Sequence, residues 1–208
     1  MKRAVRRYGG TAVGLAVILL TGVPPYRLTA QTPDPLPAGY GTLKRDDIVV
    51  RFATDQIEIQ FLPLEEQVIR LLAPDTYRPL HQLVQSRQTE LAGAAQRAGV
   101  SRATLVMVTF FGLVPQARFT PEDVNVTSRG RLFRPVGIVP LSPTWSSQQL
   151  EARQQAVVLY LFEEGISFRE ALTVSYQGLS NDSWTRALRA LDRERSRVLV
   201  RAQARPNP

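Results

Sequence analysis

The residues with the clearest chemical potential form an arginine–aromatic group between positions 129 and 145. Arg129, Arg131 and Arg134 surround Phe133, and Trp145 follows eleven residues after Arg134. Guanidinium groups bind carboxylates and phosphates through paired hydrogen bonds, and they stack on aromatic rings. The group therefore predicts a contact site for an anionic or sugar-like ligand. The alternative is that Phe133 is a core residue and the arginines are solvated, since arginine is the usual basic residue of this chain.

Residues suited to catalysis or metal binding are few. The chain has one histidine, His81, and no cysteine, so a multi-histidine or thiolate metal site is excluded. A histidine base also needs a nucleophile, and no nucleophile motif occurs. Three adjacent acidic pairs, which we interpret as solvated charges, are Asp46-Asp47, Glu65-Glu66 and Glu163-Glu164. Without a phosphate-, dinucleotide- or calcium-binding motif, the sequence predicts a protein that is not an enzyme and has no cofactor or metal.

Positive charge is concentrated at the two ends of the chain. Of 26 basic residues, five lie in residues 1–30, which contain no acid; residues 31–208 retain 21 basic and 18 acidic residues, a net charge of +3. From Asp182 onward there are seven arginines and three acids. Strong binding to polyanions over the whole surface is therefore not expected, and the local excess belongs to the C-terminal segment.

The first 30 residues have the layout of a secretory signal peptide. A basic start at 1–7 precedes an uncharged, largely apolar stretch at 9–23, and Ala30 offers a small residue before Gln31. We expect cleavage between Ala30 and Gln31, export to the periplasm or the cell exterior, and no transmembrane span in the mature chain. The alternative is an uncleaved anchor, although the apolar stretch is shorter than the roughly 20 residues that cross a bilayer. Residues 31–45, rich in proline and glycine, predict an extended spacer.

The pattern that follows predicts a single domain over residues 46–200. Residues 47–52 and 56–62 alternate apolar and polar side chains around a short turn, which indicates a hairpin. A helical insertion is expected at 64–98, with one long helix from 76 to 98 that carries an apolar stripe.

Further strands are expected after this insertion. Residues 103–111 and 155–162 are apolar on both faces, which is typical of central strands, so we expect the long helix to cover an outer sheet face. A strand is also predicted at 131–139, where Pro135 marks an edge or a bulge. Residues 172–176 are expected to form the last strand.

A C-terminal helix is expected over residues 183–200, followed by a disordered tail at 201–208. Asp192 and Glu194 interrupt its arginines, which favours a solvated face with ion pairs four residues apart. The alternative is a surface that contacts an anionic lipid or an acidic partner. Cytoplasmic nucleic acid is not an expected partner, because the chain is expected to be exported.

The elements between residues 103 and 176 follow one another in a recurring order. An apolar strand, LVMVTFF, precedes Phe119-Thr120-Pro121-Glu122-Asp123-Val124, a turn at Gly130, the sequence Phe133-Arg134-Pro135, a VVLYLF strand and a closing LTVSY. This order resembles small secreted bacterial domains with an immunoglobulin-like β-sandwich, over about 75 of the 208 residues. The resemblance implies a cell-surface or periplasmic setting and no particular chemistry. The expected fold is mainly β, an immunoglobulin-like sandwich with a helical insertion and a C-terminal helix, and α+β overall.

These observations predict an exported, non-catalytic binding or interaction module of the bacterial cell envelope. Its partner would be a protein or an envelope component. Two alternatives stay open because a fold does not fix a function. The first is a structural accessory subunit of an envelope assembly, docked through an edge strand and the basic helix. The second is a hydrolase without a recognisable motif.

Overall fold

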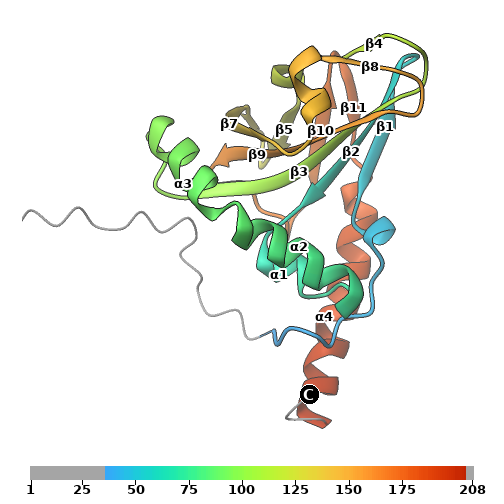
Figure 1. The fold of residues 1–208 in the computed structure, drawn as a ribbon. Helices are drawn as coiled ribbons and strands as arrows, with labels where there is room; N and C mark the ends of the chain where they lie inside the picture. The colour runs from blue at the N-terminus through green and yellow to red at the C-terminus, as the bar shows by residue number, and fades with distance from the viewer. Residues whose placement is uncertain (1–35, 205–208) are drawn as a thin grey trace, which may run out of the picture.

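The computed structural model describes residues 36–204. The expected signal peptide, its cleavage point between Ala30 and Gln31, and residues 205–208 lie outside this range. The described chain is of the α+β class. It contains two larger antiparallel sheets, a group of short helices and one long C-terminal helix (Figure 1).

The larger sheet has five strands in the order β1-β2-β3-β9-β7, each antiparallel to its neighbours. They are β1 Val50–Ala53, β2 Ile57–Pro63, β3 Ala103–Gly112, β9 Gln155–Glu163 and β7 Pro135–Pro140. The predicted hairpin is β1–β2, and the two expected central strands, β3 and β9, pair in the middle of the sheet. Consecutive residues of β3, such as Met107 and Val108, are both buried, so both sheet faces are covered here.

The second sheet has four strands in the order β11-β10-β5-β6. They are β11 Leu179–Asn181, β10 Leu172–Tyr176, β5 Asn125–Ser128 and β6 Arg131–Phe133. A short pair, β4 Ala117–Arg118 and β8 Gln149–Leu150, forms a third, two-stranded sheet. The sheets contact each other through aromatic side chains, since the rings of Phe110 in β3 and Tyr176 in β10 have centroids 6.1 Å apart. Strand β11 follows β10, so the prediction that 172–176 is the last strand is wrong.

The single strand predicted over 131–139 is also wrong, because it forms two strands in different sheets. Strand β6 ends at Phe133 in the four-stranded sheet, and β7 begins at Pro135 in the five-stranded sheet. Proline lacks an N–H group and restricts the residue before it, here Arg134, which favours a change of direction. The expected irregularity is present, since the register of β7 shifts between Pro135 and Gly137 at the sheet edge.

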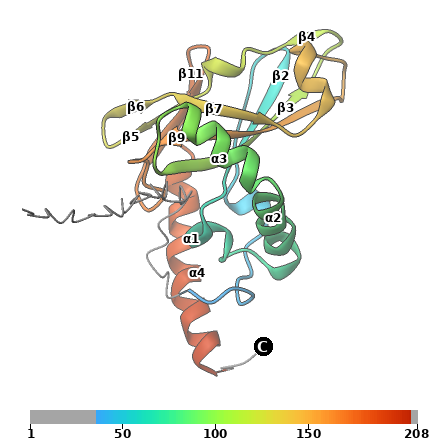
Figure 2. The same cartoon turned by 60° about the vertical axis from the view of Figure 1, so that its left-hand side comes forward.

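Three short helices separate β2 from β3: α1 Glu66–Ile69, α2 Pro74–Ser86 and α3 Gln88–Arg97. The predicted single helix over 76–98 is therefore divided at Arg87, which has φ −105° and ψ 9°. As expected, the helix covers the outer face of the larger sheet, where Leu91 and Ala94 of α3 are buried (Figure 2). At Gly137 of β7, a Cβ atom would lie 3.5 Å from the Cβ of Ala94, so helix and strand approach closely.

The C-terminal helix α4 runs from Trp184 to Ala204, four residues beyond the expected end at 200. One side of it is buried, including Trp184, whose ring centroid lies 5.5 Å from that of Phe168. The C-terminal end of α4 extends beyond both sheets and the short helices (Figures 1 and 2).

Residues 36–45, the described part of the expected spacer, lie against the helices. Leu36 is buried, and Leu43 forms a parallel bridge with Leu72. Gly41 passes so close to the backbone of Leu71 that a Cβ atom would lie 2.3 Å from the Leu71 carbonyl. A residue with a side chain does not fit there without displacing the backbone, so this segment is packed rather than free.

Candidate functional site

The first half of the predicted arginine–aromatic group lies on the β5–β6 hairpin. Arg129 forms a two-pronged ion pair with Glu170, in which Nε donates to Oε2 over 2.6 Å. Arg131 pairs with Glu163 at 2.6 Å, and its guanidinium carbon lies 4.8 Å from the centre of the Phe133 ring. Phe133 itself is buried. These two arginines are therefore already matched by carboxylates, and the aromatic ring faces the core.

Trp145 has a different environment. It is half-buried on a short 3-10 helix, η3 Pro143–Ser147, with ring centroids of Phe119, Phe110 and Tyr160 at 5.5, 6.2 and 6.5 Å. These contacts make it part of the aromatic cluster at one end of the core. Its indole therefore stabilises the fold by burial.

The two halves lie at opposite ends of β9. Arg131 is held at the last residue of the strand, Glu163, whereas the helix that carries Trp145 is bonded to its first residue, Gln155. A strand of nine residues is roughly 25 Å long. Arg134 is exposed where the chain crosses between the sheets, and it has no ion pair within residues 36–204. The fold thus keeps the tryptophan apart from the arginines.

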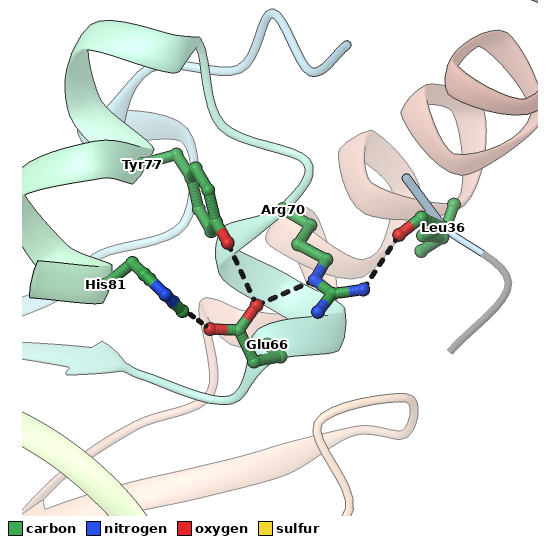
Figure 3. A network of polar contacts seen from close by, with 5 residues as sticks. All are labelled: Leu36, Glu66, Arg70, Tyr77 and His81. Carbon is green, nitrogen blue, oxygen red and sulfur yellow. Dashed lines mark hydrogen bonds and ion pairs between the residues drawn. The ribbon is translucent and has the colours of Figure 1, made fainter. Parts of the chain in front are cut away.

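Glu66 on α1 is the centre of a second polar group, shown in Figure 3. Its Oε2 atom accepts hydrogen bonds from Nε of Arg70 at 2.7 Å and from the hydroxyl of Tyr77 at 3.2 Å. Its Oε1 atom lies 2.6 Å from Nδ1 of His81. Arg70 also donates to the carbonyl of Leu36 at 3.0 Å. The group therefore joins α1, α2 and the beginning of the described chain.

The protonation states of Glu66 and Tyr77 suit a structural role that holds these elements together. Burial opposes the ionisation of Glu66, but hydrogen bonds from Arg70 and His81 outweigh it and hold the pKa of this carboxyl below its ordinary value. Burial and the nearby Glu66 carboxylate raise the pKa of Tyr77, so the phenol stays protonated as a donor. A nucleophilic tyrosine needs the opposite shift.

A small apolar hollow lies between the α2–α3 junction and the outer face of the larger sheet. It is lined by Val84, Leu91, Leu105 and Leu161, among others, and has a volume of about 80 Å³. Small-molecule sites usually have volumes of roughly 300–1,000 Å³. The hollow is therefore a gap in helix–sheet packing of insufficient size for a typical organic ligand.

Glu194 on α4 is a buried carboxylate that binds the entry segment. Its side chain is 2% exposed, and Oε1 accepts hydrogen bonds from both N and Oγ1 of Thr42 at 2.8 Å. Both terminal nitrogens of Arg201 donate to the same oxygen at 3.0 Å, and Arg201 also donates to the carbonyl of Tyr40. Burial would raise the pKa of Glu194, but the bonds from Arg201 and Thr42 outweigh it and lower the pKa.

The opposite side of α4 presents a line of positive charge, here called the arginine face. It consists of Arg186, Arg189, Arg193 and Arg197, all exposed. Each is three or four residues from the next, which places them on one side of the helix over roughly 16 Å.

These four side chains have no acidic partner within residues 36–204. In the part of the chain that the structure describes, none of them forms an ion pair with a carboxylate. Nε of Arg193 donates a hydrogen bond to the carbonyl of Arg189 at 3.0 Å. The nearby Asp192 lies 3.5 Å from Arg195 instead. Beyond the C-terminal end of the arginine face, Leu199 and Val200 are 37% and 64% exposed.

The polar groups centred on Glu66 and Glu194 were both missed by sequence reasoning. We interpreted Glu66 and Glu194 as solvated charges, whereas the Glu66 side chain is 18% exposed and Glu194 is buried. A signal for Glu194 was present, since it falls on the same stripe as Ala187, Leu191 and Val198 at helical spacing. No comparable signal exists for Glu66, because its donors come from separate elements.

Comparison of the chain with protein-family models, with curated proteins and with solved structures finds no match. Residues 36–204 contain no cluster of three or more histidine and acidic side chains placed to bind a metal ion. The helices of the same region lack the combination of length and apolar content that a membrane crossing requires.

Proposed function

We propose that the protein is an exported, non-catalytic interaction module of the bacterial cell envelope that docks through the arginine face of α4. One observation carries the proposal: four exposed arginines share one side of a projecting helix, and no carboxylate within residues 36–204 pairs with them. Unpaired charge costs little in water and is available to a partner.

The envelope setting is supported by the sequence of the first 30 residues. A basic start, an apolar stretch and Ala30 before Gln31 are typical of a signal peptide. We accordingly propose a mature chain that begins at Gln31 and functions in the periplasm or outside the cell. The absence of cysteine is compatible with that setting, because a domain of this size can be stable without disulfides.

For the fold, we propose an immunoglobulin-like arrangement of the two larger sheets. In its favour, both sheets are antiparallel, they contact through Phe110 and Tyr176, and the chain changes sheet between β6 and β7 and between β9 and β10. The helices α2 and α3 and the long α4 are additions to such a sandwich.

A structural accessory subunit is the second candidate. It is favoured by Leu132 in the edge strand β6, whose exposure is 52%. The edges at β11 and β1 are less available, since Asn181 of β11 donates to the carbonyl of Arg51 in β1 at 2.8 Å. The subunit would bind a protein at constant stoichiometry through Leu132, whereas the module would use α4.

Site-specific photo-cross-linking in intact cells tests the proposal. A cross-linking amino acid replaces Ser196, which is exposed beside the arginine face, and a control replaces Asp55, exposed in the β1–β2 turn. We expect position 196, and not position 55, to form a covalent adduct with an envelope component. The exported protein should have the mass of a chain that begins at Gln31. Absence of an adduct at 196, or equal labelling at both positions, would overturn the proposal. An adduct from position 132 alone would favour the accessory subunit.

A further inference from the structure

We infer that the partner of the arginine face is the surface of an anionic phospholipid bilayer. This inference rests on the proposed function and names the partner of the same surface. Four observations support it: the shape of the charged line, the residues at its end, the pairing of several other arginines, and the bonds between the N-terminal segment and α4.

The shape of the arginine face fits a bilayer better than a folded protein. The face is a straight line of charge on a convex helix, and its centre, between Arg189 and Arg193, holds no aromatic or large apolar side chain. Protein interfaces have an apolar centre in which charged residues are depleted. A bilayer surface offers phosphate groups at any position along a line of roughly 16 Å, with no need for a matching pocket.

The C-terminal end of the arginine face is followed by exposed apolar side chains. Leu199 and Val200 are exposed on the turn after Arg197, and the C-terminal end of α4 extends beyond the sheets and the short helices (Figure 1). A bilayer provides phosphates and, a few ångströms deeper, hydrocarbon. A soluble polyanion provides only the first of these.

Several arginines elsewhere on the surface are matched by acid. Arg51, Arg102, Arg129 and Arg131 pair with Asp46, Glu164, Glu170 and Glu163, respectively. A bias toward arginine in the whole chain explains why the basic residues are arginines. It does not explain why four of them align on one side of one helix with no carboxylate of residues 36–204 paired with them.

The described N-terminal segment is bonded to α4, and the expected leader lies shortly before that segment in the sequence. Tyr40 and Thr42 are bonded to Arg201 and Glu194 of this helix. The apolar stretch at 9–23 precedes Tyr40 by 17 residues, which reach at most roughly 60 Å. A chain emerging from a membrane through that leader would therefore fold with α4 within reach of the bilayer.

Vesicle binding tests the inference. The chain from Gln31 onward, which includes all described residues, is mixed with vesicles of phosphatidylcholine alone or with 30% phosphatidylglycerol. We expect binding only to the anionic vesicles, weakening as salt is raised. Replacement of all four arginines of the arginine face by glutamine should weaken binding by roughly several hundredfold, since each basic residue near an anionic surface contributes about fivefold.

A matched control separates position from net charge. Arg78→Gln, Arg118→Gln, Arg134→Gln and Arg153→Gln together remove the same charge from exposed sites that have no ion pair within residues 36–204. We expect this variant to bind within about threefold of the unmodified chain. An equal loss in both variants would show that net charge alone drives binding and would overturn the inference.

The remaining outcomes separate this inference from the proposed function. Absence of binding to the anionic vesicles overturns the lipid inference. If the cross-linker at Ser196 still forms an adduct with a protein, the interaction module stands and its partner is an acidic protein. If that adduct is also absent, both proposals are wrong.

Discussion

The two sides of α4 use charge in opposite ways. On the inward side, Glu194 is buried and receives four hydrogen bonds from Thr42 and Arg201. On the outward side, the arginine face has no carboxylate partner among residues 36–204. One helix thus contains a charge that the fold has fully satisfied and four charges that it has left to the solvent.

This difference separates residues that hold the structure from residues that are available for binding. A buried carboxylate is stable only while its donors stay in place, so Glu194 ties α4 to the entry segment. An exposed guanidinium adds little to stability, so its position is not explained by folding. The inward side should therefore control stability, and the outward side should control association.

The largest effect should come from the apolar part of the inward side. Trp184 is fully buried against Phe168, and Trp184→Ala should lower the free energy of unfolding by about 3–5 kcal/mol. Trp184→Phe is the control, because it keeps a ring and removes an indole N–H that has no acceptor. It should cost less than about 1.5 kcal/mol. Urea unfolding followed by circular dichroism measures both, and equal losses would show that Trp184 is not a packing anchor.

Removing the buried carboxylate should have the next largest effect. Glu194→Ala leaves the N–H and hydroxyl of Thr42 without their acceptor. The guanidinium of Arg201 is one-third exposed, so it can form hydrogen bonds with water instead. We expect a loss of about 2–4 kcal/mol in the free energy of unfolding. Asp192→Ala, two residues away on the exposed side, should change it by less than about 0.5 kcal/mol. Equal effects in the two variants would contradict the contrast between the two sides of α4.

Acid should weaken the inward side specifically. The pKa values of Glu194 and Glu66 are lower in the folded chain than their ordinary value of 4.5, so the unfolded chain binds protons first as pH falls. Their contribution to the free energy of unfolding is complete above about pH 4.5. It is lost as the pH falls through the lower pKa values of the folded chain. The free energy of unfolding, measured between pH 7 and pH 3, should therefore decline less steeply in Glu194→Gln. A slope in Glu194→Gln equal to that of the unmodified chain would contradict this expectation.

The smallest effect on stability should come from the arginine face. Replacing its four arginines by glutamine should change the free energy of unfolding by no more than about 0.5 kcal/mol per site, with a slight gain where like charges no longer repel. The same variant has the largest expected effect on vesicle binding. Thermal unfolding of the variant tests this directly, and a loss of several kcal/mol would mean that these side chains support the fold.

Strands with strong local patterns were predictable from the sequence. Alternation of Ile57, Ile59 and Phe61 with polar residues placed β2 and its hairpin, and the continuous apolar runs placed β3 and β9 in the middle of a sheet. The same reasoning joined β6 and β7 into one strand, because periodicity is a local property. It does not record that Arg134 and Pro135 carry the chain from one sheet to the other.

The candidate site was predictable only in part. The concentration of arginine after Asp182 indicated a basic helix, but the proposed Arg129–Trp145 group was divided between two ends of β9. Close spacing in sequence does not imply closeness in space across a change of sheet. Among the helix arginines, spacing of three and four residues was enough to place four of them on one side.

The sequence by itself therefore determined the helix, its local positive charge and the strands β1, β2, β3 and β9 of the larger sheet, because these depend on residues within a few turns or one strand. Only the tertiary structure distinguished the acidic residues that form buried hydrogen bonds from those that stay exposed. Glu194 and Asp192 differ by two positions, yet one is buried because Thr42, 152 residues earlier, comes to lie beside it. The arginines remain unpaired because no carboxylate of residues 36–204 was brought to their side of the helix.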